Sequence, residues 1–517
     1  MRRGFLAISI SLALIFVWAC GHKSPLGRGL SIDDLKRWVR PEYALDATKI
    51  QAEIQRQASA TPYGMYADSY SHKHYQNQQP LVWFTRMGLV HEADTLLSYL
   101  ADVEELGFKP NSFHADTLRS MLDRFQRHDY SKQDASTLAA RIEYLLTHAY
   151  LRYACGQRYG FLHARHLMNR LLEDAPEPGE TRTSVIYRQI YDQQNEEVTD
   201  SFVHHALQQV QKHQMTAFLH EIQPSDTLYR QMQAEYNRAR QLGDSERTRL
   251  ARINMERARW RYPHPTKGRY IWVNLAAQEL LAVDTQRDTM ASMRICCGNA
   301  SHKTPLLHST INHVELNPYW VIPQTIVRKE IAPRHVGDSA YYARNNYRAF
   351  NKDTKQFVNP ARLSAADLRS GRYTLRQEKG AGNSLGRIIF RFPNKFSVYL
   401  HDTNNRGAFQ RSDRAISHGC VRVERPLDLA LFFLDNPSPL YIDRIRMSIG
   451  LQPLSPQGKR YQEENPEPKS MGSIGYSSPV PVWLDYWTLY PTPHGTLQPH
   501  PDRYGYDRAL EKELNRI

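Results

Sequence analysis

Apolar residues recur at helical spacing through much of the first half of the chain. They occupy positions i, i+3, i+4 and i+7 in the series Leu89, Ala93, Leu96, Leu97, Leu100 and Val103. A second series has the same spacing: Leu138, Ile142, Leu145, Leu146 and Ala149. Charged residues occupy the opposite faces, so we expect these apolar stripes to pack on one another. The pattern predicts a mostly α-helical domain over residues 81–262.

The pattern changes to short apolar runs from residue 270 onward. Each run is bounded by turn residues, as expected of strands, and the runs cover residues 270–275, 293–297, 387–392 and 397–400. A domain boundary is therefore expected at residues 263–266. The polar interval over residues 333–386 is too long for an ordinary connection and predicts an inserted subdomain or a flap over a cleft. The fold class predicted is α+β, with a helical N-terminal part and a β-rich C-terminal part.

The last part of the chain begins with a proline-rich stretch. Six prolines between Pro453 and Pro481 predict a loop. After it, residues 480–490 have the pattern of a strand and residues 506–515 that of a closing helix.

The N-terminus resembles an export signal. Arg2 and Arg3 precede an apolar run from Phe5 to Trp18, which is shorter than the roughly 20 residues of a membrane-spanning helix. The sequence Val17-Trp18-Ala19-Cys20 then resembles the lipobox of bacterial lipoproteins. This resemblance implies lipidation of Cys20 and a periplasmic, membrane-anchored protein, and the alternative is an ordinary cleaved signal in which Cys20 is incidental.

Charge and residue counts exclude several classes of protein. The 67 Lys and Arg residues against 53 Asp and Glu residues give a net charge of +14, which favours polyanions, anionic lipids or carboxylate-rich polymers. No block of like charges indicates a nucleic-acid tail. No CxxC or HExxH spacing occurs, so neither a metal nor another cofactor is expected. His308 and His313 are expected on a solvated strand, and three cysteines are expected to be buried: Cys155, Cys296 and Cys297.

One histidine and one cysteine have the pattern of a nucleophilic pair. His401 ends a predicted strand, and Cys420 follows nineteen residues later, in a glycine-containing turn before a helix-like stretch. A helix N-terminus and a nearby imidazolium would lower the pKa of the Cys420 thiol from its usual value of about 8.5. The N–H groups of Gly419 and Cys420 are candidates for an oxyanion hole, and Arg422 is a candidate for binding a substrate carboxylate.

These residues also carry a family resemblance. The stretch Ser417-His418-Gly419-Cys420-Val421-Arg422, together with His401, resembles the signature of the L,D-transpeptidase (YkuD-type) catalytic domain. Other stretches resemble the large periplasmic, YcbB-like subfamily, which has a helical scaffold domain: 80–83, 151–153, 314–323, 376–387 and 479–505.

The resemblance implies a cysteine enzyme of the bacterial cell wall. Such an enzyme attacks the third residue of a tetrapeptide stem, expels D-alanine and forms a thioester. The amine of an acceptor stem then resolves the thioester and gives a 3→3 cross-link. Family members are also acylated by carbapenems. Peptidoglycan stem peptides are thus the implied donor and acceptor, with no nucleic acid partner and no cofactor.

The resemblance also implies roles for individual residues. Cys420 is the nucleophile and His401 is the base that later protonates the leaving amine. Asp402 follows His401 where relatives use a small residue or a backbone carbonyl, so its carboxylate either orients His401 or points away. Trp320 either flanks the cleft or anchors a core. The remaining residues implied to line or flank the donor site are Ser417, His418, Gly419, Arg422 and Tyr399.

Two alternatives to cross-link formation remain at this level. Water in place of the acceptor amine would make the protein an L,D-carboxypeptidase or a hydrolase that cleaves cross-links, with the same cysteine. A non-catalytic wall-binding lipoprotein is the alternative from another class. The domain limits predicted are 1–20 (signal peptide), 21–80 (tether with a short helical segment), 81–262 (scaffold domain), 266–450 (catalytic domain, with an insert at about 333–386), 451–478 (proline-rich loop) and 479–517 (C-terminal strand and helix completing the catalytic domain).

Overall fold

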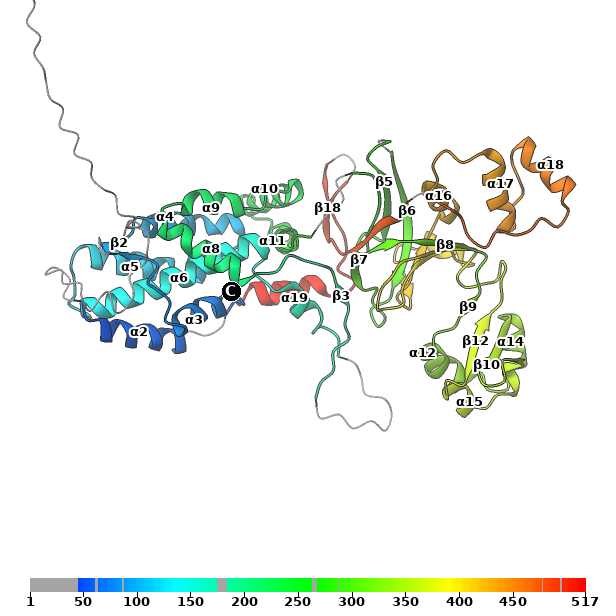
Figure 1. Ribbon diagram of the computed structural model, residues 1–517, viewed down its shortest axis with the longest axis horizontal. Coiled ribbons are helices and arrows are strands. Elements are labelled where there is room, and N and C mark those ends of the chain that lie inside the picture. Colours follow the sequence, from blue (N-terminus) through cyan, green and yellow to red (C-terminus); the bar gives the residue numbers. More distant parts are fainter. Residues whose placement is uncertain are drawn as a thin grey trace, which may run out of the picture. The chain divides into compact units, whose positions relative to one another are not determined.

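The computed structural model describes residues 45–60, 64–85, 88–173, 184–262, 267–287, 289–476, 478–492 and 495–517. These residues form two compact units (Figure 1). Unit 1 takes residues up to 104 together with 108–154 and 198–223, and unit 2 takes 105–107, 155–197 and 224–517. The predicted signal peptide, Cys20 and the boundary at residues 263–266 lie outside the described residues. Within those residues, no helix is both long and apolar enough to span a membrane.

Unit 1 is helical, as the apolar periodicity predicts. The side chains of Leu96, Leu100 and Leu146 are fully buried, which confirms that the stripes face a common core. The short strands β1 (Phe84–Thr85) and β2 (Gly88–Leu89) pair with each other. The helices are α2 (Ala47–Ala60), α3 (Asp68–Gln76), α4 (Glu92–Ala101), η3 (Pro110–Phe113), α5 (Ala115–Gln126), α8 (Asp200–Gln211) and α9 (Met215–Ile222). Helices η2 (Asp102–Leu106) and α6 (Ala135–Tyr159) belong partly to each unit.

The prediction of a tether up to residue 80 is wrong for its last part. Helices α2 and α3 occupy most of residues 47–76, and α2 buries Ile50 and Ile54. These two residues are spaced i, i+4, as on one face of a helix. The sequence therefore contains a helical pattern here, but it is short and lies inside a polar stretch. Asp68 of α3 is buried and accepts hydrogen bonds from Arg152 at 2.6 and 2.7 Å.

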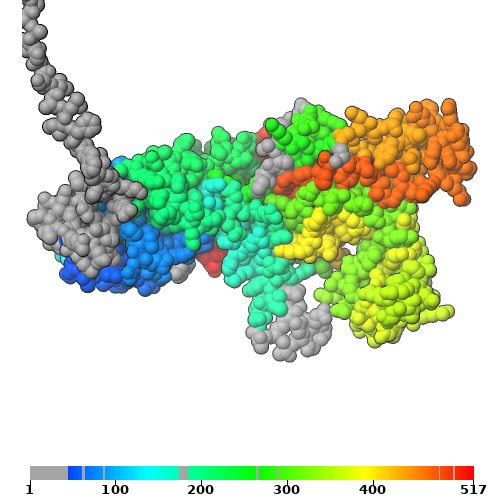
Figure 2. Space-filling view, in the orientation of Figure 1, coloured from blue at the N-terminus to red at the C-terminus, as the bar shows by residue number. Residues whose placement is uncertain are grey.

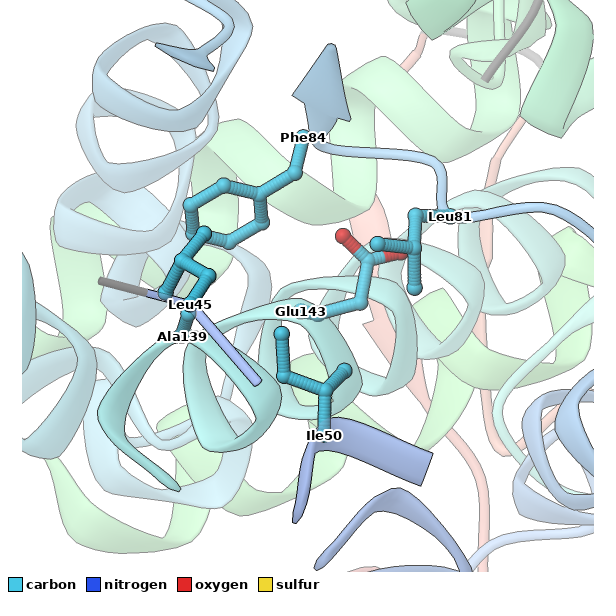
Figure 3. A pocket seen from close by; sticks show the side chains of 6 residues that line it. All are labelled: Leu45, Ile50, Leu81, Phe84, Ala139 and Glu143. Carbon is cyan, nitrogen blue, oxygen red and sulfur yellow. The ribbon is translucent and has the colours of Figure 1, made fainter. Parts of the chain in front are cut away.

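A buried carboxylate holds the segment that follows α3. Glu143 of α6 accepts hydrogen bonds from the Val82 and Trp83 N–H groups and from the Tyr75 hydroxyl. Its side chain lies at an otherwise apolar pocket lined by Leu45, Ile50, Leu81, Phe84 and Ala139 (Figure 3). Burial raises the pKa of Glu143 to about 7, against the lowering effect of its hydrogen bonds. Glu143 therefore has a structural role.

Unit 2 is built on one large mixed sheet, which confirms the β-rich C-terminal part. Its strand order is β3-β7-β17-β4-β5-β6-β16-β14-β13-β8, with β15 paired to β6. The strands are β3 (Tyr191–Asp192), β4 (Arg269–Asn274), β5 (Glu279–Asp284), β6 (Thr289–Gly298), β7 (Leu306–Ile311), β8 (His313–Leu316), β13 (Ile388–Arg391), β14 (Leu400–His401), β15 (Ala415–Ser417), β16 (Val421–Val423) and β17 (Val480–Asp485).

Strand β17 comes late in the chain but lies inside the sheet. It pairs in parallel with β4 and antiparallel with β7. The expected strand over residues 480–490 ends at Asp485, and β18 (Leu489–Pro491) then pairs with β19 (Leu497–Pro499). The expected closing helix is α19 (Tyr506–Leu514).

Helices of the predicted scaffold range also belong to unit 2. These are α10 (Thr227–Gln241) and α11 (Ser245–Arg259), together with the short α7 (Ala164–Met168). Met232 of α10 and Met255 of α11 pack with Leu489 of β18 in one core cluster. The buried Arg257 of α11 pairs with Asp507 of α19 at 2.6 Å. These contacts group the two helices with the sheet although their periodicity is helical.

The insert is a subdomain with its own core. Strands β9 (Trp320–Val321), β10 (Tyr347–Asn351), β11 (Phe357–Val358) and β12 (Tyr373–Gln377) form a sheet in the order β11-β10-β12-β9. Around it lie α12 (Gln324–Ile326), the π-helix η4 (Val327–Ile331), α13 (Ala332–Arg334), α14 (Ser339–Arg344), η5 (Pro360–Arg362) and α15 (Ala365–Arg369). Ile322 and Val327 belong to its core, so the insert begins earlier than expected. Its residues, yellow-green in Figure 2, gather in one lobe.

The proline-rich loop is partly helical, so that prediction is wrong over residues 456–464. Helix α18 (Pro456–Glu464) begins inside it, after α16 (Pro426–Phe432) and α17 (Pro439–Ser448). Pro456 stands at the first position of α18, where a missing N–H is tolerated, and Ser455 accepts a hydrogen bond from the Gly458 N–H at 3.0 Å. Pro456 therefore marks a helix start within this stretch.

Candidate active site

Two adjacent parallel strands bring the predicted pair together. Strand β14 pairs with β16 so that Leu400 lies opposite Val421 and His401 lies opposite Arg422. Leu400 and Val421 are buried on one face of the sheet. Because side chains alternate along a strand, His401 and Cys420 project from the other face, two residues apart, or about 6.6 Å along the strand.

The Cys420 thiol lies against the backbone and side chain of Tyr399. The sulfur donates to the Ser397 carbonyl at 4.0 Å, and the hydroxyl and N–H of Tyr399 act to lower the pKa of the thiol. Among the described contacts there is no direct hydrogen bond between Cys420 and His401. The Tyr399 ring lies edge-on to the His401 ring, with 5.7 Å between centroids, so Tyr399 contacts both predicted catalytic residues.

The electrostatic environment differs from the one expected. Burial raises the pKa of the Cys420 thiol to about 11, against the hydrogen bonds of Tyr399 and the charges of Arg422 and Arg391. The expectation of a helix N-terminus is wrong, since Cys420 directly precedes strand β16 and α16 begins only at Pro426. The resting thiol is therefore neutral.

The imidazole of His401 is neutral as well. Its side chain is buried, and burial together with the positive charge of Arg422 lowers its pKa to about 3. The peptide oxygens of Asp402 and Leu385 oppose this shift. A neutral imidazole can accept a proton, so His401 has the protonation state that a general base needs.

The partner that orients His401 is a peptide oxygen. His401 Nδ1 donates to the carbonyl oxygen of Asp402, which leaves Nε2 as the acceptor of the neutral ring. The Asp402 carboxylate points away and accepts from the Arg387 N–H at 2.9 Å and from Arg406 at 3.0 Å. Gly386, at φ +63°, passes so close that a Cβ there would lie 2.3 Å from Asp402 Cγ. Of the two readings of Asp402, the structure supports the one in which its carboxylate points away.

The turn before Cys420 is held by its own hydrogen bonds. Ser417 Oγ donates to the Cys420 carbonyl at 2.6 Å and accepts from the Gly419 N–H at 3.1 Å. Gly419 has φ +121°, a conformation that favours glycine. The expected pair of oxyanion donors is thus reduced to one, because the Gly419 N–H is engaged and only the Cys420 N–H lacks a partner among the described residues. Ser417 positions the turn.

Two residues that the sequence analysis did not assign to the site, Thr304 and Tyr504, hold this turn through hydrogen bonds. Thr304 Oγ1 donates to the Gly419 carbonyl at 2.8 Å. The Tyr504 hydroxyl accepts from the Thr304 N–H at 3.2 Å and donates to the Gly298 carbonyl at 2.7 Å. Thr304 and Tyr504 are buried, and no spacing in the sequence links residues about 200 positions apart.

The cysteine motif also contacts the insert. His418 Nε2 lies 2.8 Å from Glu330 Oε1, and Glu330 belongs to the π-helix η4 of the insert. The His418 ring also packs on the His302 ring, with 4.8 Å between centroids. His418 and Glu330 are about half exposed, so this contact lies at the surface of unit 2.

Three further residues predicted for the site have different surroundings. Tyr399 is at the site, and Arg391 lies over its ring at 5.4 Å. The Arg422 Nε is buried without a hydrogen-bond partner, and no described carboxylate pairs with this guanidinium, so its carboxylate-binding role stays a prediction. Trp320 packs against the core of the insert, which supports its reading as a core anchor.

The cysteines and histidines outside the site have structural surroundings. Cys155, Cys296 and Cys297 are buried and unpaired, as predicted. The expectation of a solvated strand is wrong for His308, whose ring lies 4.1 Å from that of Tyr262 and whose side chain is 12% exposed. His308 and Tyr262 are therefore part of the packing around β17.

Comparison with known proteins matches both parts of the chain. Residues 268–442 match the YkuD family, described as the L,D-transpeptidase catalytic domain, and residues 67–235 match a family described as a scaffold domain. A protein of Haemophilus influenzae that is provisionally named as an L,D-transpeptidase is 29% identical over 247 residues. The match covers 47% of this chain and 46% of that relative, so it spans about half the length of each.

Proposed function

Since this chain carries an L,D-transpeptidase catalytic domain of the YkuD family together with a scaffold domain, we propose that it forms 3→3 cross-links in peptidoglycan through a thioester on Cys420. The observation that supports this most directly is the parallel pairing of β14, which ends at His401, with β16, which begins directly after Cys420, within the matched residues. The reaction is an acyl transfer with a cysteine nucleophile.

The first half of the reaction acylates the enzyme. The Cys420 sulfur attacks the carbonyl carbon of the third stem residue while its proton passes to His401 Nε2. Because thiol and imidazole are both neutral at rest, this proton moves during the attack and not before it. The new C–S bond replaces the C–N bond to D-alanine, whose amine leaves with the proton from His401.

The second half transfers the stem to an acceptor. The amine of the acceptor's diamino acid attacks the thioester carbon, the C–S bond breaks, and the proton that the amine loses returns to the sulfur through His401. The Cys420 N–H, which has no partner among the described residues, supports the negative oxygen of both tetrahedral intermediates. Arg422 supplies a buried cation for a carboxylate of the donor stem.

The proposed site of action is the periplasm. The export signal and the lipidation of Cys20 would place the chain on a membrane facing the wall, and its net charge of +14 suits a carboxylate-bearing polymer. Labelling of cells with a radioactive fatty acid, with Cys20→Ala as the control, tests the lipid anchor: the wild-type chain is expected to carry label and the variant is not.

The test of the reaction is the mass of the intact protein after exposure to a carbapenem. One added carbapenem is expected on the wild-type chain and none on Cys420→Ala, whereas Cys155→Ala, which changes a buried cysteine, retains the adduct. Muropeptides incubated with the enzyme are then analysed by mass spectrometry. Cross-linked 3→3 dimers support transfer, while tripeptides alone would show a carboxypeptidase and overturn the proposed acceptor step.

A further inference from the structure

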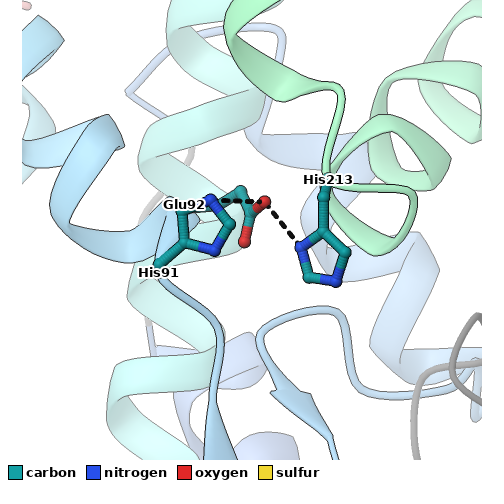
Figure 4. Close-up of side chains that lie close together, drawn as sticks. All are labelled: His91, Glu92 and His213. Carbon is teal, nitrogen blue, oxygen red and sulfur yellow. Dashed lines mark hydrogen bonds and ion pairs between the residues drawn. The ribbon is translucent and has the colours of Figure 1, made fainter.

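Three side chains of unit 1 that lie far apart in the sequence meet at one point. His91 directly precedes α4, Glu92 is the first residue of α4, and His213 lies in the connection between α8 and α9. Glu92 Oε1 lies 3.3 Å from His91 Nε2 and 2.8 Å from His213 Nδ1. Figure 4 shows the carboxylate between the two imidazole rings. We infer that these three residues bind a divalent transition-metal ion of the Zn²⁺ class.

The distances suit a metal with little rearrangement. The three donor atoms all lie within 4.8 Å of one another. Zn²⁺ binds nitrogen and oxygen at about 2.0–2.2 Å in a tetrahedral arrangement, which separates neighbouring donors by about 3.3–3.6 Å. Small rotations of two surface side chains therefore bring all three donors into the range of Zn²⁺ coordination.

The carboxylate is incompletely satisfied without an ion. Glu92 is 3% exposed, and its Oε2 is buried with no hydrogen-bond partner among the described residues. A buried carboxylate oxygen without a partner is unfavourable, because it has lost its water and gained nothing in return. Oε1 is the oxygen that faces the two imidazoles, so an ion would give Oε2 a partner only if the carboxylate bound it through both oxygens.

The two imidazoles explain why an ion fits better than a pair of protonated histidines. Their rings are stacked, with centroids 5.4 Å apart and 16° between the ring planes. Two imidazolium rings in this arrangement would place two positive charges face to face beside one carboxylate. Two neutral imidazoles can instead offer Nε2 and Nδ1 as ligands to one cation.

The donor set selects the class of metal and leaves a path for it. Two imidazole nitrogens and one carboxylate suit Zn²⁺, whereas Mg²⁺ and Ca²⁺ prefer oxygen ligands alone. The side chains of His91 and His213 are 74% and 50% exposed, so an ion can enter from solvent and keep water as a further ligand. Motif spacing could not reveal the site, because Glu92 and His213 are 121 residues apart.

The ion would join the start of α4 to the α8–α9 connection within unit 1, whereas the residues proposed for catalysis belong to unit 2. The inference is therefore independent of the proposed transpeptidase reaction, and the readout of its test is metal binding. The full chain, freed of metal with EDTA and carrying no affinity tag, is titrated with Zn²⁺ by isothermal calorimetry. One equivalent is expected to bind, and excess Mg²⁺ is expected not to displace it.

Variants identify the ligands. Glu92→Gln and His91→Ala are each expected to raise the Kd for Zn²⁺ by at least about 100-fold. His204→Ala, which removes an exposed histidine of the same unit, is expected to leave the Kd unchanged. Because the His91 side chain is 74% exposed, its removal is expected to leave the unit folded, and circular dichroism of each variant checks the fold.

Cobalt gives a second readout. Co²⁺ in the wild-type chain is expected to show the intense visible absorption of a four-coordinate site, and His91→Ala is expected to lose it. Failure to bind one equivalent of Zn²⁺, or binding of unchanged affinity in both variants, would overturn the inference.

Discussion

Two of the places where a histidine is followed by an acidic residue, one in each unit, have opposite geometries. In unit 1 the pair is His91-Glu92, and the carboxylate of Glu92 contacts the imidazole of its neighbour and that of His213. In unit 2 the pair is His401-Asp402, and the carboxylate of Asp402 has no contact with the His401 ring, which uses the peptide oxygen instead.

The backbone explains the difference. His401 ends strand β14, and successive side chains of an extended chain point to opposite faces, so the two side chains of the pair diverge. His91 has φ −67° and ψ −16° at the start of α4, a helical conformation that allows the neighbouring side chains to converge. In these two pairs, the backbone conformation decides whether the carboxylate can reach the neighbouring imidazole.

The largest expected effect comes from removing the imidazole of unit 2. His401→Gln keeps a polar side chain but cannot act as a base at neutral pH. The rate of acylation by a carbapenem is expected to fall by about 10²–10⁴-fold, followed by intact-protein mass against time. An unchanged rate, with the melting temperature of the variant also unchanged, would show that another group removes the proton.

The next effect tests whether thiol and imidazole are both neutral. With the pKa of Cys420 raised to about 11 by burial, the rate of alkylation by iodoacetamide is expected to rise about tenfold per pH unit from pH 7 to 10. Mass spectrometry of the peptide that contains Cys420 measures this rate, with Cys420→Ala as the background. A plateau already below pH 8 would instead indicate a thiolate–imidazolium pair.

A smaller effect, on stability, is expected from adding a side chain at Gly386, whose backbone passes close to the Asp402 carboxylate. Gly386→Ala places a Cβ 2.3 Å from Asp402 Cγ at φ +63°, and it is expected to lower the free energy of unfolding by about 2–4 kcal/mol. Gly371→Ala is the matched control, since Gly371 has φ +76° but nothing within 4 Å of the added atom. Its cost is expected to be about 1 kcal/mol, from backbone strain alone. Equal losses in urea melts would contradict the role of the close approach.

The smallest effect on the rate of acylation is expected from replacing the Asp402 carboxylate. Asp402→Asn retains the peptide oxygen that holds His401, so the acylation rate is expected to change by less than about threefold. Stability falls by about 1–2 kcal/mol, because the charged partner of the Arg387 N–H and of Arg406 is lost. A fall in rate comparable to that of His401→Gln, at an unchanged melting temperature, would make Asp402 the orienting group after all.

Local patterns predicted much of this molecule. The helical periodicity of unit 1 and the strand that ends at His401 are present in the structure, and this strand pairs with the one that begins directly after Cys420. The motif carried this information because its residues occupy a few positions on two adjacent strands.

What the sequence did not reveal depends on contacts between distant residues. The raised pKa of the Cys420 thiol follows from burial, and the Gly419 N–H donates to Ser417 within the folded turn. Thr304 and Tyr504 reach that turn from other parts of the chain. No periodicity or spacing encodes such contacts, because they exist only once the sheet has formed.

The position of β17 has a consequence for how the protein is made. Strands β4 and β7 both pair with β17, which is translated more than 150 residues after them because it begins only at Val480. A ribosome that has released everything up to α16 has therefore produced a sheet with a gap in its interior, and Tyr504 is not yet available to support Thr304. The turn before Cys420 can reach its final geometry only after β17 and the segment that carries Tyr504 have joined this sheet.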